Sequence, residues 1–247
     1  ALATLIAGNM MAQMHGVLNF AGASTANVLN QNVENPSDTV KFEMVNAASG
    51  NITLPNITND NLVISSFTIA NVAFTMGANH VVTMPDQTFA TKVTVGGEEK
   101  NITGSSLKGT YNMADNSLTL NLTFKYGAMP FDMTYSIKAY YIKPVASAIT
   151  VNVGGAFNYA NENVSYSVRK YIDNNVQKVD VEIPTYTLDN TVMGNLTLGT
   201  YTVKGLTYDE EKGGFYRDYK NDGLKLQFTA ETGGKKNMDG DYSFNPE

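Results

Sequence analysis

The sequence predicts an all-β protein, and two observations carry that prediction. Apolar and polar residues alternate along several segments, most clearly along Asn116–Lys125 and Met129–Ile142. Alternation with period two gives a strand one buried and one solvated face, as in an antiparallel sheet. Turn-forming pairs such as Gly96-Gly97 and Asn174-Asn175 separate the segments, and almost no segment has the 3.6-residue period of a helix.

Further strands are expected along both halves of the chain. Alternation also marks four other segments: Thr39–Val45, Asn163–Ile172, Lys178–Ile183 and Leu224–Ala230. Strands of about 6 to 10 residues that follow one another at intervals of about 10 to 15 residues are typical of an antiparallel sandwich or barrel.

The first residues have the character of an export signal. Residues 1–33 contain no Asp, Glu, Lys or Arg. Within them, Ala1–Gln13 has a short apolar run and then small residues, as in the later part of a secretory signal peptide. We predict that residues 1–13 are a signal-peptide remnant; the alternative is a buried segment of the fold. The run is too short to span a bilayer, so no transmembrane segment is expected.

An internal repeat sets the number of domains. Leu62–Phe74 aligns without gaps on Leu196–Tyr208, and the apolar, aromatic and Thr positions mostly agree. Other matches in the same chain order are Asn19-Phe20 with Asn158-Tyr159, Thr39–Met44 with Lys178–Ile183, Gly96–Asn101 with Gly233–Asn237, and Gly109–Tyr111 with Gly240–Tyr242. Ordered self-similarity indicates duplication. We therefore predict two antiparallel barrels, residues 14–143 and 144–247.

The second copy is shorter than the first. After Gly109–Tyr111 the first copy adds two amphipathic strands, whereas the second copy ends soon after Gly240–Tyr242. A barrel without two adjacent strands exposes sheet edges, which soluble proteins normally avoid. Either the sequence stops about thirty residues short of a complete second barrel, or another segment supplies the strands. We favour the first explanation.

Composition excludes several classes of function. The net charge of −6 and the pI near 5.0 argue against a nucleic-acid partner, which requires a basic face. The absence of Cys removes disulfides, thiolate metal sites and cysteine nucleophiles. The two histidines, His15 and His80, and the scattered carboxylates form no recognisable acid, base or metal set. We therefore expect no cofactor, no metal and no enzymatic activity.

The repeated phrases resemble a known family. Asn195–Tyr208 and Ala128–Asp132, within two Thr- and Asn-rich copies, are similar to the calycin-like β-barrel domains of secreted Bacteroidetes proteins. The resemblance implies lipocalin-like barrels of about eight strands, exported to the periplasm, the outer-membrane surface or the extracellular space. It carries over no functional residues. The Gly-x-Trp signature of true lipocalins is absent because the chain has no Trp.

Three groups of residues are candidates for function. If the first barrel holds a ligand, its wall residues would be Leu118, Leu120, Leu122, Phe124, Phe131, Met133, Tyr135 and Ile137; the alternative is that they fill the barrel. The densest aromatic and charged cluster, a candidate interaction surface, is Phe215, Tyr216, Arg217 and Tyr219. Under the family resemblance, Thr39 in Asp38-Thr39-Val40 is a candidate O-glycosylation acceptor.

Two function classes compete. The first is an exported, non-enzymatic cell-envelope protein that binds a small apolar ligand or a surface glycan or protein through its barrels. The second is a structural or interaction module of a surface assembly, such as a spacer or a pilus-like or accessory subunit, in which an open barrel edge accepts a partner strand. A glycan-active enzyme is a remote third. The sequence does not fix the oligomeric state.

Overall fold

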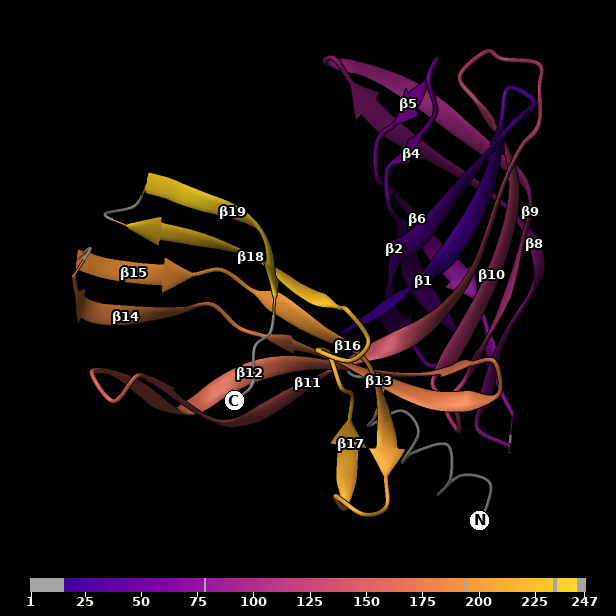
Figure 1. Cartoon of the computed structure of the whole chain (residues 1–247). Coiled ribbons are helices and arrows are strands. Elements are labelled where there is room, and N and C mark those ends of the chain that lie inside the picture. Colours follow the sequence, from indigo (N-terminus) through magenta and orange to yellow (C-terminus); the bar gives the residue numbers. More distant parts are fainter. Residues whose placement is uncertain (1–15, 78, 193, 233–234, 244–247) are drawn as a thin grey trace. The chain divides into compact units, whose positions relative to one another are not determined.

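A computed structural model describes residues 16–77, 79–192, 194–232 and 235–243 (Figure 1). The described residues form strands and turns without a helix, which confirms the all-β prediction. In this part of the chain, no helix is long and apolar enough to cross a membrane. The chain divides into two compact units, residues 1–142 and 143–247. The expected leader, residues 1–13, lies outside the described residues.

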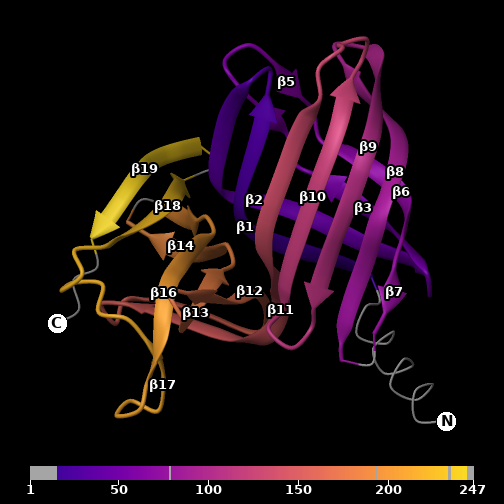
Figure 2. The ribbon, with the colours of Figure 1, turned by 90° about the vertical axis from the view of Figure 1, so that its right-hand side faces the viewer.

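The first unit is a meander of antiparallel strands (Figure 2). Its strands are β1 (Val17–Val28), β2 (Gln31–Asn46), β3 (Ser49–Leu54), β4 (Ile57–Thr58), β5 (Val63–Ile64), β6 (Phe67–Ala73), β7 (Thr75–Met76), β8 (Val81–Val95), β9 (Glu98–Asn112), β10 (Ser117–Tyr126) and β11 (Met133–Val153), whose last residues belong to the second unit. The sheet order is β6-β3-β2-β1-β11-β10-β9-β8-β7, so the first and last long strands, β1 and β11, are paired.

Side-chain hydrogen bonds connect β6 and β8, near the two ends of this sheet, where no backbone pairing is present. No backbone ladder is recorded between β6 and β8 in the described residues. Instead, the Gln87 side chain accepts a hydrogen bond from Ala73 N and donates one to Ala73 O, both at 2.9 Å. Thr91 Oγ1 donates to Thr68 O at 2.7 Å. The barrel of the first unit therefore has a seam made of side-chain contacts.

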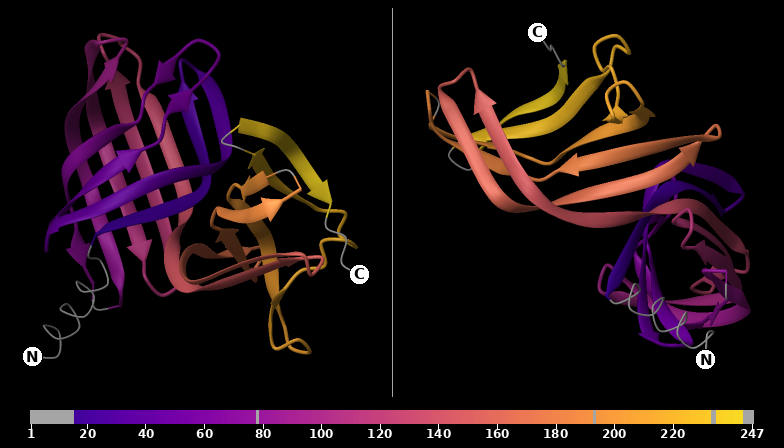
Figure 3. Two further views of the ribbon diagram at one scale, coloured as in Figure 1. Left: turned by 90° about the vertical axis from the view of Figure 1, so that its left-hand side faces the viewer. Right: turned by 90° about the horizontal axis from the view of Figure 1, so that it is seen from below.

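One core fills the first unit. Seen from its end, the strands of this unit curve around a common interior (Figure 3, right). The inward positions of the alternating strands form a single cluster of buried apolar residues. Phe20, Phe124 and Tyr135 are its largest fully buried side chains. The alternation in the sequence thus marks the buried faces of the sheet.

The second unit consists of two smaller sheets. Its strands are the last part of β11, then β12 (Phe157–Asp173), β13 (Val176–Ile183), β14 (Tyr186–Thr191), β15 (Gly194–Leu198), β16 (Tyr201–Asp209), β17 (Gly214–Tyr216), β18 (Lys225–Thr232) and β19 (Lys235–Ser243). One sheet has the order β11-β12-β13-β16-β17, and the other has the order β14-β15-β18-β19. Neither sheet closes into a barrel through the pairings of the described residues.

The internal repeat is visible in the backbone. The hairpins β1–β2 and β12–β13 are counterparts, and both turn through two residues of positive φ, Leu29-Asn30 and Asn174-Asn175. The counterparts diverge afterwards. Strand β6 pairs with β3, whereas its counterpart β16 pairs directly with β13. Strand β14, which follows β13 in the chain, pairs with β15 and not with β13. Strands β14 and β15 therefore belong to the separate second sheet.

A bulge with one geometry occurs in both copies. Asn71 in β6 and Gly205 in β16 occupy the same position of the repeat, and both have positive φ, 55° and 70°. In each copy a side-chain oxygen of the neighbouring strand accepts the N–H of this residue. Asn51 Oδ1 accepts that of Asn71 at 3.1 Å, and Asp180 Oδ1 accepts that of Gly205 at 2.7 Å. The duplication therefore preserved a local irregularity as well as the strand pattern.

The core of the second unit is less complete than that of the first. Its buried members are Ile149, Tyr186 and Leu188, with partly buried residues of β11, β12, β14 and β15 around them. Phe67 and Ile69 are buried in the first copy, whereas their counterparts Tyr201 and Val203 are only half-buried. The apolar faces of the second unit are therefore partly accessible.

The seam yields a stability prediction. Gln87→Ala removes two hydrogen bonds between β8 and β6, and should lower the free energy of unfolding by about 1–2 kcal/mol. Urea unfolding followed by circular dichroism measures the change. Gln31→Ala, on an exposed residue of β2, is the matched control. Equal effects of the two substitutions would show that the seam does not depend on Gln87.

Candidate binding site

The residues expected to line a ligand cavity in the first unit are packed against one another. Seven of them have at most 4% of their surface exposed: Leu118, Leu120, Leu122, Phe124, Met133, Tyr135 and Ile137. They belong to the single core cluster. An exposed fraction this small means that protein atoms surround each side chain, so these residues fill the barrel. Their role in holding a ligand stays a prediction that the packing does not support.

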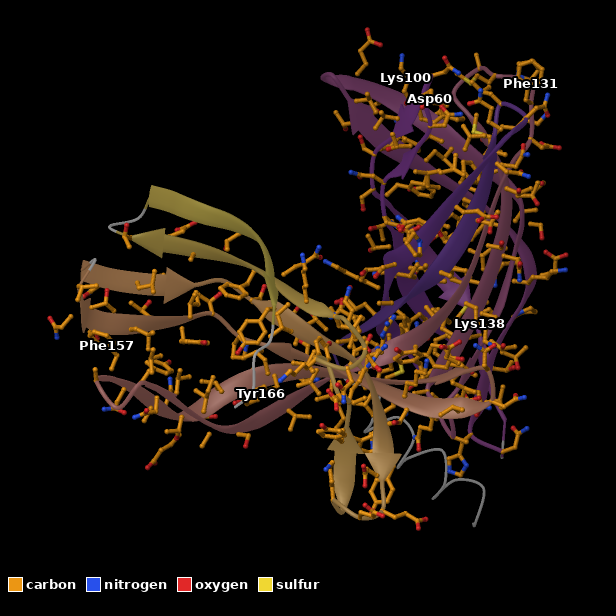
Figure 4. The ribbon with its side chains drawn as sticks, viewed as in Figure 1. Asp60, Lys100, Phe131, Lys138, Phe157 and Tyr166 are labelled. Carbon is orange, nitrogen blue, oxygen red and sulfur yellow. The ribbon has the colours of Figure 1, made fainter. Side chains whose placement is uncertain are left out.

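The eighth residue, Phe131, does not belong to the barrel wall. It is 55% exposed and lies in the turn between β10 and β11, at the same end of the first unit as Asp60 and Lys100 (Figure 4). The apolar alternation includes Phe131, but β11 begins only at Met133. Pro130 has no N–H to donate to a sheet ladder, which favours a turn at this point.

One carboxylate lies inside the wall of the first unit. Asp38 of β2 is 7% exposed and accepts three hydrogen bonds. Ser24 Oγ and Tyr135 Oη donate to Oδ2, the latter at 3.1 Å, and Asn35 Nδ2 donates to Oδ1 at 2.5 Å. A buried carboxylate requires such donors. The cluster ties together β1, β2 and β11, the strands that join the start of the barrel to its end.

The predicted interaction surface divides into two parts. Phe215 and Tyr216 in β17 are 37% and 40% exposed, and Tyr208 on the paired strand is 60% exposed. The rings of Tyr208 and Phe215 meet edge to face, with their centres 5.7 Å apart. Lys212 Nζ lies 4.5 Å from the centre of the Tyr216 ring. The β16–β17 hairpin therefore exposes a small aromatic surface.

Tyr219 does not belong to this exposed surface, so its part in an interaction surface stays a prediction that its burial does not support. It is 8% exposed, and its hydroxyl accepts a hydrogen bond from Lys204 N and donates one to Lys204 O at 3.3 Å. Arg217 is half-buried beside it. Its Nη1 donates to Lys204 O at 3.2 Å and its Nε donates to Asp222 Oδ2 at 2.8 Å. Both side chains hold the segment after β17 against β16.

These two residues line a cavity. A space of about 350 Å³ lies where β16, the segment after β17 and the start of β18 meet. Its lining residues are Thr200, Tyr201, Thr202, Lys204, Arg217, Tyr219, Leu224, Lys225 and Gln227. The volume falls in the range of about 300–1,000 Å³ that is usual for small-molecule sites. It is open to solvent on one side, and hydrogen-bonding side chains and tyrosines line it, in contrast to the closed apolar interior of the first unit.

Gly205 allows Arg217 to reach its position. A Cβ atom at residue 205 would overlap the Arg217 guanidinium. Asp180 of β13 accepts the N–H of Gly205, lies at a register shift between β13 and β16, and is 6% exposed. In addition to Gly205 N, it accepts hydrogen bonds from Arg169 Nη2 at 2.6 Å and Tyr171 Oη at 3.1 Å. Burial, followed by the charge of Asp180, raises the pKa of Tyr171 to about 12.

The sequence reasoning identified Arg217 and Tyr219 but missed most of this cavity. Lys204, Lys225 and Tyr201 stand in ordinary strand patterns, so nothing in the sequence separates them from other strand residues. Gly205 did offer a signal, because a glycine inside a strand pattern indicates a bulge or a close approach of another group. Asp180 offered none, because its burial depends on the register shift.

The remaining candidate, Thr39, is exposed on β2 beside the buried Asp38. Its glycosylation stays a prediction. Among the described residues, no group of three or more His, Asp or Glu side chains could hold a metal ion.

The fold and the repeat define a tandem protein of the small antiparallel β-barrel class. Residues 8–137 and 147–243 each match the calycin-like beta-barrel domain, so the chain belongs to the calycin-like family, in two tandem copies. No curated protein and no solved structure matches the chain. The secreted Bacteroidetes origin that the resemblance implied stays a prediction.

The buried Tyr135 predicts a specific response to alkaline pH. Burial, followed by the negative charge of Asp38, raises the pKa of Tyr135 well above its usual value. The unfolded state then loses its proton near pH 10 while the folded state keeps it, so stability is present below pH 10 and falls above it by about 1.4 kcal/mol per pH unit.

Tyr135→Phe should remove this contribution, so that the free energy of unfolding falls less steeply between pH 10 and 11. At neutral pH the variant should be less stable by about 1–3 kcal/mol, because Asp38 loses a donor. Urea titrations across this pH range measure both effects. Tyr208→Phe, on an exposed hydroxyl, is the control. An unchanged slope in Tyr135→Phe would contradict the assignment.

Gly205 gives a second prediction. Asn tolerates positive φ, as Asn71 does at the equivalent position, but its Cβ would overlap Arg217. Gly205→Asn should therefore lower the free energy of unfolding of the second unit by about 1–3 kcal/mol. Gly213→Asn is the matched control, since Gly213 has φ of 66° and an added Cβ there would meet no described atom within 4 Å. Equal stability of the two variants would show that Arg217 does not depend on the close approach to Gly205.

Proposed function

We propose that this chain is an exported, non-enzymatic binding protein of the cell envelope, and that its second unit recognises a polar ligand, a saccharide. The observation that carries the proposal is the contrast between the two units. The first has a filled apolar interior, whereas the second has a cavity of about 350 Å³ lined by hydrogen-bonding groups and tyrosine rings. The first unit would then be a rigid scaffold.

A saccharide fits the lining better than an apolar ligand does. Eight of the nine lining residues carry a polar side-chain group, and Leu224 is the exception. An apolar ligand would remove water from these hydroxyls, the amide and the cations without giving them new partners, which opposes its binding. A sugar offers hydroxyls to these groups and an apolar ring face to the half-buried Tyr201. This argument replaces the apolar ligand expected from the sequence.

The nature of the lining residues supports a role in binding without catalysis. Hydrolysis of a glycosidic bond usually employs two carboxyl groups on either side of the bond. The nine lining residues include cations, tyrosines, threonines and a glutamine, but no carboxylate and no histidine. Export is supported by the short apolar run and the small residues of Ala1–Gln13, as in the later part of a signal peptide.

A role in a surface assembly is the second candidate. The specific observation in its favour is the exposed aromatic surface of Tyr208, Phe215 and Tyr216 on the β16–β17 hairpin. Aromatic residues are enriched at protein interfaces. A partner protein bound there would leave the cavity residues free, so the two candidates are separable by mutation.

The experiment is a saccharide-binding screen with the full chain by native mass spectrometry. We expect no retained apolar adduct in the purified protein and reversible complexes with soluble oligosaccharides. Thr202→Trp, which fills the cavity, should abolish these complexes, whereas Thr83→Trp, on an exposed residue of β8, should preserve them. A retained lipid, or saccharide binding unaffected by Thr202→Trp, would overturn the proposal.

A further inference from the structure

The cavity of the second unit is positively charged in a protein that is negatively charged as a whole. The chain has 17 Lys and Arg against 23 Asp and Glu, yet three of the nine lining residues are Lys204, Arg217 and Lys225. A concentration of one sign of charge in a hollow raises the local potential and favours ligands of the opposite sign.

Two carboxylates near the cavity are paired with arginines, and one of them offsets part of the charge of the lining residue Arg217. Asp222 pairs with Arg217, and Asp180 pairs with Arg169 beneath Gly205. No ion pair is recorded for Lys204 or Lys225 within the described part of the chain. Glu182 lies opposite Thr202 in the β13–β16 register, so it adds one acidic residue beside the lining, and the three cations of the lining outnumber it.

Arg217 is held in a fixed position with donors to spare. Its guanidinium has five N–H groups. Nε donates to Asp222, and Nη1 donates to Lys204 O. Its Nη2 donates no recorded hydrogen bond to the described residues, although Arg217 lines the cavity. An arginine fixed by its own contacts binds a carboxylate without losing further side-chain freedom, and its planar fork matches the geometry of that group.

Two tyrosine rings lie beside these cations. Tyr201 packs on one side against Phe228, with the ring centres 5.7 Å apart, and Tyr219 is fixed through its hydroxyl to Lys204. Both rings line the cavity together with Thr200, Thr202 and Gln227. The site thus combines a carboxylate-binding group with the partly accessible ring of Tyr201 and with hydroxyl and amide partners, a set that suits a sugar acid.

We infer that the ligand of the second unit is an acidic saccharide, a uronic acid or an oligomer of one, whose carboxylate binds Arg217 between Lys204 and Lys225. This inference rests on the proposed function and specifies its ligand class. The sugar ring lies against the half-buried Tyr201, and its hydroxyls bind the threonines and Gln227. The site acts by binding alone, without bond making or breaking.

Isothermal titration calorimetry of the full chain with galacturonate oligomers and with galactose oligomers of the same length tests the inference. Binding of the acidic oligomer should be at least tenfold tighter, because its carboxylate forms a charge-assisted hydrogen bond with Arg217 that the neutral oligomer lacks. Its affinity should fall as salt rises. Equal affinity for both oligomers would refute the acidic ligand and leave the proposed function standing. Binding of neither, nor of any other saccharide in the screen, would refute both.

Substitutions of the lining cations test which of them bind the ligand's carboxylate. Arg217→Gln should weaken galacturonate binding about tenfold or more while changing galactose binding much less. Because Arg217 also supports the segment after β17, Lys225→Gln provides a second test that does not disturb the fold. It should weaken galacturonate binding about two- to fivefold and reduce the salt dependence. Lys220→Gln, on the same segment but outside the lining, is the control. Equal effects of Lys225→Gln and Lys220→Gln would overturn the assignment.

Discussion

The pairing of β1 with β11 is the contact on which the first unit depends. It joins residues more than one hundred positions apart, from Phe20 opposite Tyr141 to Asn27 opposite Thr134. Gly22 permits the close approach, because a Cβ atom there would overlap the backbone of Lys138 and Ala139. The buried Asp38 then binds donors from both strands. With these strands joined, the inward apolar side chains of the described strands form one buried cluster.

The second copy has a similar strand pattern, but its described strands do not close into a barrel. Its counterpart of β6 pairs with a different neighbour, its sheets stay separate, and its apolar positions are half-buried. The bulge that the two copies share is nevertheless present at Gly205. In the second copy the missing Cβ of Gly205 also leaves room for the Arg217 guanidinium. The filled interior of the first unit leaves little space for a ligand, whereas the less densely packed second unit contains a cavity. The division of roles between scaffold and binding unit follows from this difference in packing.

Much of the fold could be predicted from the sequence, and little of the site could. The alternation of Asn116–Lys125 predicted β10 to within one residue, because period-two patterns report directly on burial. The same reasoning failed at Phe131, where the pattern continues into a turn. The site depends on contacts between distant segments: Arg217 reaches Lys204, and Asp180 turns inward at a register shift. Local patterns do not encode such contacts.

The central claim is that ligand binding belongs to the second unit and that the first is a filled scaffold. The most direct measurement is a titration of the isotopically labelled full chain with galacturonate oligomers, followed by the backbone amide signals in solution NMR. The account predicts shifts concentrated at residues 200–206 and 217–227, with the signals of Leu120 and Tyr135 unchanged. Shifts confined to the core strands of the first unit would contradict it.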